Sequence, residues 1–77
     1  MKFFFNLHSE DAVDIDGDGV ELPSLQAARE EACHSAREMI AELVLENKPI
    51  DGMTFEIVDE RGEVRAVIRF RDLIRLE

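Results

Sequence analysis

Apolar residues recur every three to four positions in the middle of the chain and alternate with polar residues on either side. Between Ser24 and Asn47, placing each residue about 100° on from the last produces one apolar stripe. The stripe comprises Leu25, Ala28, Ala32, Ala36, Met39, Ile40, Leu43 and Val44. The opposite side carries Glu30, Glu31, His34, Arg37, Glu38 and Glu42. This division predicts one long amphipathic helix that packs on a sheet.

The residues at the two ends of this helix favour its start and its stop. Ser24 is a good N-cap, because its hydroxyl can accept an N–H group of the first turn. Asn47 can adopt the left-handed conformation that ends many helices. Pro49 disfavours helical geometry at Lys48, so the helix should end there.

The alternating segments predict β-strands before and after the helix. The expected strands are Lys2–His8, Ala12–Ile15, Met53–Val58 and Val64–Phe70, with Val20–Leu22 extended before the helix. The expected inward residues are Phe3, Phe5, Leu7, Val13, Ile15, Met53, Phe55, Ile57, Val64, Ala66, Ile68 and Phe70. Asp72 is expected to cap a closing helical turn over 72–77.

The element order is therefore β-β-α-β-β in a single small α+β domain, 1–77. Two hairpins form one mainly antiparallel four-stranded sheet, and the helix covers one face. In the last hairpin the inward residues are odd-numbered on one strand and even-numbered on the other. Opposed residues share a face, so the loop should hold an even number of residues. It is either 59–62, placing Glu56 opposite Arg65, or Arg61 and Gly62 alone.

Three segments resemble a family of small bacterial proteins. They are Phe3-Phe4-Phe5-Asn6-Leu7, the stretch from Asp16 to Leu25, and Ala27 to Ala32. Members of that family pair an aromatic "FFH"-like first strand with a "GxELPxLxxAxxEA" start of the helix. The resemblance covers nearly the whole chain and departs at Asn6, where the family often has His. The family is a domain of unknown function, so the resemblance implies a compact fold and a bacterial source, and no activity or site residue.

Length and charge narrow the possible classes of protein. The 77 residues suit one core, and the single Cys33 excludes an internal disulfide. No apolar stretch approaches the length of a signal-peptide core or a membrane span, so we expect a cytoplasmic protein without a membrane partner. The net charge of −9 disfavours nucleic acid and anionic membranes. Five of the nine basic residues nevertheless follow Glu60: Arg61, Arg65, Arg69, Arg71 and Arg75.

The sharpest local motif is the run from Asp14 to Gly19. It fits the D-x-D-x-D-G opening of a calcium loop, with Asp14, Asp16 and Asp18 as candidate metal ligands. Leu25 stands where the bidentate Glu of such a loop should be, and β structure precedes the motif instead of a helix. A tight acidic turn is therefore the favoured interpretation, and weak divalent-cation binding the alternative.

Enzyme chemistry has the least support in this sequence. His8 and His34 lie on different elements without a cysteine pair, which disfavours structural zinc. Ser24 and Ser35 have no neighbouring base, and no glycine-rich phosphate loop precedes the helix. We expect no catalytic residues and no cofactor.

The sheet face away from the helix is the best candidate for binding. Its candidate interface residues are Phe4, Glu56, Val58, Arg65, Val67, Arg69 and Arg71. The apolar members would supply contact area and the charged ones a polar rim, although the arginines could instead pair with acids on neighbouring strands. We hypothesise a non-catalytic protein-interaction module, with an unknown protein partner or a weak homodimer. An antitoxin-like inhibitor is a third possibility, by analogy of fold alone.

Overall fold

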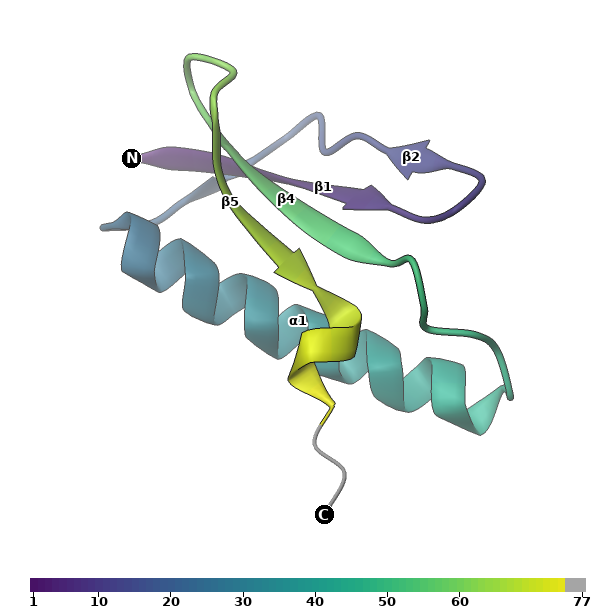
Figure 1. Ribbon diagram of the computed structural model, residues 1–77. Coiled ribbons are helices and arrows are strands. Elements are labelled where there is room, and N and C mark those ends of the chain that lie inside the picture. The colour runs from purple at the N-terminus through teal and green to yellow at the C-terminus, as the bar shows by residue number, and fades with distance from the viewer. Residues whose placement is uncertain (75–77) are drawn as a thin grey trace.

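The computed structural model describes residues 1–74, in which one long helix lies against an antiparallel sheet (Figure 1). The elements are β1 (Lys2–His8), β2 (Val13–Asp14), β3 (Val20–Glu21), α1 (Leu25–Leu45), β4 (Thr54–Asp59), β5 (Val64–Arg69) and the 3-10 helix η1 (Phe70–Leu73). The order across the sheet is β2-β1-β4-β5, and β3 also pairs with β1. The predicted α+β class and β-β-α-β-β order are confirmed.

The second strand of the first hairpin is split into two pieces along one edge of β1. β2 pairs with the end of β1 through Leu7 and Asp14, and β3 pairs with its start through Phe3 and Val20. Between these two pairs β1 has three residues, 4–6. The segment that connects β2 to β3 has five residues, 15–19. The two extra residues make this segment bulge away from the sheet.

The expected inward positions of Val13 and Ile15 are wrong, because these side chains are 53% and 64% exposed. Val13 lies opposite His8, and Asp14 lies opposite Leu7. Opposed residues share a face, so this register turns Val13 away from the helix. The Ser9–Ala12 turn sets the register, as the N–H of Ser9 donates to the carbonyl of Ala12 at 2.9 Å.

The hairpin of β4 and β5 contradicts the expected even-numbered loop. The N–H of Asp59 donates to the carbonyl of Glu63 at 2.9 Å, and the N–H of Gly62 donates to that of Asp59 at 3.0 Å. The loop therefore holds three residues, 60–62. Gly62 has φ of 82°, the left-handed conformation that such loops require at their last position.

A β-bulge in β5 then restores the expected pairing in the body of this hairpin. Glu56 lies opposite Val67, the register that the two-residue alternative predicted, and not opposite Arg65. The register shifts between Ile57 and Val58, where Val58 pairs with Val64, so Arg65 is the extra residue. Between the loop and the bulge, Val64 lies opposite Val58 on the face away from α1, where it is 51% exposed and not inward as expected.

Both predicted ends of the helix are confirmed. The Ser24 hydroxyl accepts the N–H of Ala27 at 3.1 Å. At the other end Asn47 is left-handed, with φ of 58°. The N–H of Lys48 donates to the carbonyl of Leu43 at 2.8 Å, which completes the cap.

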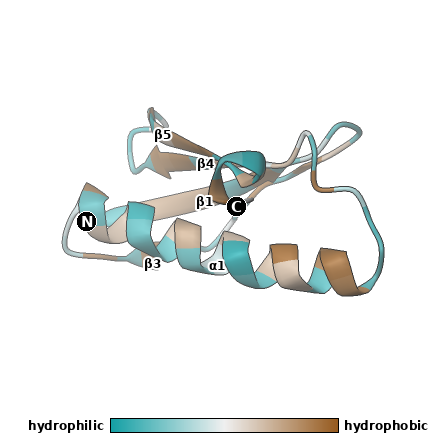
Figure 2. Cartoon of the chain, turned by 60° about the horizontal axis from the view of Figure 1, so that its bottom comes forward, coloured by the Kyte–Doolittle hydropathy of each residue, from teal (hydrophilic) through white to brown (hydrophobic). Residues whose placement is uncertain are grey.

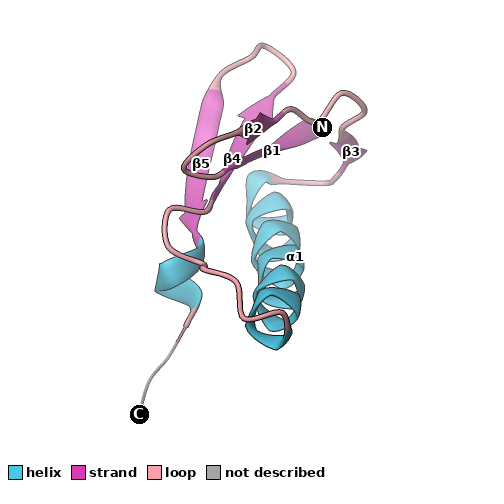
Figure 3. Cartoon of the chain, turned by 90° about the vertical axis from the view of Figure 1, so that its right-hand side faces the viewer, coloured by secondary structure: helices cyan, strands magenta, loops and turns pink. Residues whose placement is uncertain are grey.

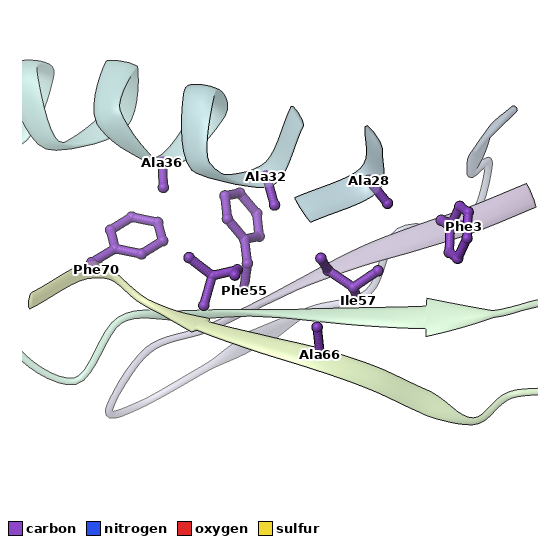
Figure 4. Close-up of a cluster of buried hydrophobic side chains, with 9 residues drawn as sticks. Phe3, Ala28, Ala32, Ala36, Phe55, Ile57, Ala66 and Phe70 are labelled. Atoms are coloured by element: carbon purple, nitrogen blue, oxygen red, sulfur yellow. The ribbon is translucent and has the colours of Figure 1, made fainter. Parts of the chain in front are cut away.

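The core lies between α1 and the sheet, which form two layers (Figures 3 and 4). Its buried residues are Phe3, Ala28, Ala32, Ala36, Phe55, Ile57, Ala66, Ile68 and Phe70. The three alanines point from α1 at the larger side chains of the strands (Figure 4). Small residues on the helix allow its backbone to approach the sheet closely, so the strands supply most of the core volume.

Three further expectations need correction, two near the C-terminus and one in α1. Phe70 is fully buried as expected, but it opens η1 and does not belong to the last strand. Arg69, not Asp72, is the N-cap of this turn, and 75–77 of the predicted turn lie outside the described residues. Val44 was expected on the inward stripe but is 62% exposed, because the last turns of α1 extend beyond the core. Figure 2 shows these turns as an apolar end of the helix.

Candidate functional site

Asp16 holds the bulging segment 15–19 against β1. Its Oδ2 accepts the N–H of Phe5 at 3.1 Å, and its Oδ1 accepts the N–H groups of Asp18 and Gly19, each at 3.1 Å. Its own N–H donates to Oδ1 of Asn6 at 3.0 Å. The carboxylate thus satisfies a strand N–H group that the bulge leaves without a backbone partner.

The hydrogen bonds also set the charge state of this carboxyl. Partial burial raises the pKa of Asp16, but the N–H groups of Gly19, Phe5 and Asp18 outweigh it, and the pKa lies below its usual value. Asp14, at the end of β2, and Asp18, within the segment, are both exposed. Within residues 1–74, no group of three or more His, Cys, Asp or Glu side chains is placed to hold a metal ion. The geometry gives the motif a structural role, as expected for an acidic turn.

The face of the sheet opposite α1, hereafter the open face, carries its side chains in three rows across β1, β4 and β5. The rows are Phe4, Val58 and Val64; Asn6, Glu56 and Val67; and His8, Thr54 and Arg69. None of the helices within residues 1–74 covers this face (Figure 3). Phe4 and Val58 are half-buried, while Val64 and Val67 are each 51% exposed. One end of the open face is therefore apolar and the other polar.

Five of the seven candidate interface residues lie in these rows: Phe4, Glu56, Val58, Val67 and Arg69. The other two do not, so the predicted arginine stripe is wrong. Arg65 occupies the bulge, and its Nη1 lies 3.3 Å from Oδ2 of Asp59. Arg71 belongs to η1, beyond the end of the strand.

Val64 belongs to the apolar row and was missed in the sequence. The signal for it was Gly62, since a glycine at the third loop position is typical of a three-residue loop, which changes the parity of the strand. Asp59 anchors that loop by accepting the N–H groups of Arg61 and Glu63 at 2.9 and 3.0 Å. The Glu63 amide is the main cause of the lowered pKa of Asp59, and Arg61 and Arg65 lower it further.

The polar end of the open face contains a histidine beside a carboxylate. His8 Nε2 lies 3.4 Å from Oε1 of Glu56, in poor geometry for a hydrogen bond. This nitrogen is inaccessible to solvent and has no hydrogen-bond partner within the described part of the chain.

The open face is close to neutral, although the chain carries a net charge of −9. Its rows contain one acid, Glu56, and one arginine, Arg69. At the edge, Lys2 lies opposite Glu21 and places its Nζ 5.9 Å from the centre of the Phe4 ring. Within residues 1–74, most of the other acids lie on α1 and in the loops.

The outer side of α1 matches the sequence analysis. His34 is 71% exposed and lies 3.7 Å from Glu38, one turn away, as expected for a solvated face. Cys33 is half-buried and packs against the core, as expected for a small apolar residue. Among residues 1–74, neither is part of a group of three or more His, Cys, Asp or Glu side chains that could hold a metal ion.

Comparisons with known proteins identify a family for this chain but no function. Across residues 1–74, no helix combines the length and the apolarity needed to cross a membrane. No curated protein and no solved structure matches the chain. Residues 2–71 match the family described as "Domain of unknown function (DUF6894)", as the resemblance to such a family predicted. The chain therefore belongs to this domain-of-unknown-function family, DUF6894.

Proposed function

We propose that this domain is a non-catalytic protein-interaction module that associates with a second copy of itself through the open face. The observation that carries the proposal is the apolar row Phe4, Val58 and Val64 on a locally neutral face of an acidic chain. Two molecules of charge −9 repel each other over most of their surfaces. The open face is where they can meet with the least local repulsion.

A two-fold arrangement fits the pattern of the rows. In such a dimer each copy contributes the same patch, and two sheet faces pack about 10 Å apart. An axis in the interface plane, running across the strands over Val58, would set the apolar row of one copy on that of the other. An axis along β4 would also bring the two apolar rows together, but it would place Glu56 against Glu56, so the first orientation is favoured.

The expected association is weak. Stable interfaces bury roughly 800 Å² on each partner. The apolar part of the open face consists of Val67, the three residues of the apolar row and, on the edge strand β2, Val13. This patch can centre a modest interface but cannot supply an obligate one.

Sedimentation equilibrium at high protein concentration tests the proposal with two matched variants. Val64→Glu introduces a charge into the apolar row, whereas Val44→Glu makes the same change on α1, outside the open face. The wild type should associate more at moderate than at very low salt, because salt screens the repulsion. Val64→Glu should stay monomeric, and Val44→Glu should match the wild type. A wild-type monomer at millimolar concentration in both salts, or equal behaviour of the two variants, would refute the proposal.

A further inference from the structure

α1 covers only part of the sheet face beneath it. It packs against β4, β5 and η1, whereas residues of β1 and β2 face it across a hollow. A groove of about 350 Å³ remains between the C-terminal half of α1 and this hairpin. Its lining residues are Phe5, Leu7, Asp14, Ile15, Asp16, Met39 and Phe55. Its volume lies within the roughly 300–1,000 Å³ that is usual for binding sites.

The floor of the groove is apolar. Phe5 and Phe55 meet edge to face, with ring centres 6.4 Å apart. Leu7 and Met39 are half-buried beside them. Ile15 stands at the rim and is 64% exposed, although its neighbours in the groove are apolar. Phe55 is part of the core and Phe5, Leu7 and Met39 pack against it. These three are only half-buried and Ile15 is exposed, so apolar area remains for a ligand to cover.

The charged side chains that line the groove and its neighbouring hollow are all acidic. Asp14 and Asp16 line it directly. A second hollow of about 350 Å³ adjoins Met53, which precedes Phe55 by two positions and so shares its face. Its other lining residues are Ser9, Glu10, Asp11, Pro49 and Asp51. The two hollows thus carry five carboxylates and no lysine, arginine or histidine.

We infer that this acid-rimmed apolar groove binds a segment of a partner protein in which apolar side chains are flanked by lysine or arginine. Charge complementarity selects that class of ligand, because the rim attracts cations and the floor accepts aliphatic groups. A second copy of this acidic chain is disfavoured here, in contrast to the open face. The inference concerns a different surface and does not depend on the proposed dimer.

A synthetic octapeptide of alternating leucine and lysine, blocked at both ends, is the probe for this inference. Two control peptides carry glutamate in place of lysine or serine in place of leucine. Amide chemical shifts of the full chain report where each peptide binds. We expect saturable shifts around Phe5, Leu7, Ile15 and Met39 with the leucine–lysine peptide, and none with either control.

Two pairs of protein variants separate specific binding from general attraction to an acidic protein. Ile15→Ser should weaken binding by about fivefold or more, whereas Val67→Ser, at a similarly exposed valine on the open face, should not. Asp14→Asn should weaken binding more than Glu31→Gln, although both remove one negative charge. All four side chains are exposed, so the variants should fold.

Several outcomes would overturn the inference. Shifts confined to the acidic outer side of α1, or equal effects of Asp14→Asn and Glu31→Gln, would indicate nonspecific electrostatic attraction. Unchanged affinity in Ile15→Ser would exclude the apolar floor. The absence of saturable shifts at millimolar peptide would exclude a site for this class of ligand.

Discussion

The two halves of α1 meet the rest of the molecule in different ways. In the first half Ala28, Ala32 and Ala36 are at most 2% exposed, and the sheet lies close beneath them. In the second half the apolar residues are larger, yet Val44 and Leu45 are 62% and 86% exposed. Burial here follows the presence of a partner surface and not the size or hydrophobicity of the helix residue. The same apolar periodicity therefore marks a core in one half and an exposed surface in the other.

The largest expected effect on stability lies beneath the first half of α1, where the sheet covers the helix. Ile57→Ala removes a fully buried side chain beneath α1 and should cost roughly 2–5 kcal/mol of the free energy of unfolding. A domain of this size is expected near the low end of about 5–15 kcal/mol, so the variant should be partly unfolded at room temperature. Urea denaturation measures the change, with Val44→Ala as the exposed control. Equal losses in the two variants would remove the distinction between the halves.

Ala32→Leu should have the next largest effect, because it adds volume where helix and sheet are in close contact. Overpacking of this kind costs roughly 1–3 kcal/mol. Ala41→Leu makes the same change at an exposed position of the same helix and should be close to neutral. Urea midpoints of the two variants provide the comparison. A stable Ala32→Leu protein would mean that the alanines leave space and do not set the helix–sheet distance.

Leu43→Ala tests the packing of the second half of α1. Leu43 is half-buried, and full burial of a leucine contributes about 1.5–3 kcal/mol, so its loss should cost roughly 1–1.5 kcal/mol. Thermal and urea unfolding should therefore place this variant between Val44→Ala and Ile57→Ala. A loss as large as that of Ile57→Ala would show that the second half of α1 is as well packed as the first.

Sequence pattern predicted the elements whose environment is set locally. β1 begins and ends where alternation placed it, and the caps at Ser24 and Asn47 form as their chemistry predicts. It also predicted which side of α1 is apolar. It could not predict where the sheet ends beneath the helix, because periodicity defines a face and not the extent of its partner. Val44 is exposed for that reason.

The incorrect predictions at the strands share one physical cause. Backbone hydrogen bonds of the Ser9–Ala12 turn and of the 60–62 loop fix the register, and each shift of one residue exchanges the two faces. Val13 and Val64 therefore moved to the open face. Of the candidate interface, five residues share that face. Arg65 lies outside the rows because it is the extra residue of a bulge. The apolar pattern of the sequence does not reveal this bulge.

The smallest expected effect on stability concerns Asp16. Its carboxylate joins the bulging segment 15–19 to β1, near the second half of α1. Its pKa is lowered in the folded state, so its contribution to stability is fully present above the unfolded value of 3.8 and is lost as the pH falls through the folded pKa. At neutral pH, Asp16→Asn should lower the free energy of unfolding by about 1 kcal/mol, since Asp16 is partly exposed.

Urea unfolding of Asp16→Asn and the wild type, repeated at each pH from neutral to acid, tests this sign. The difference between them should shrink toward zero once the pH lies below the folded pKa of Asp16. Asp18→Asn is the matched control, because the Asp18 carboxylate makes no hydrogen bond within residues 1–74. If the difference in unfolding free energy grew in acid, the folded state would favour the protonated form of Asp16, contrary to the expectation. A change as large in Asp18→Asn would mean that the whole segment, and not the Asp16 hydrogen bonds, maintains the fold here.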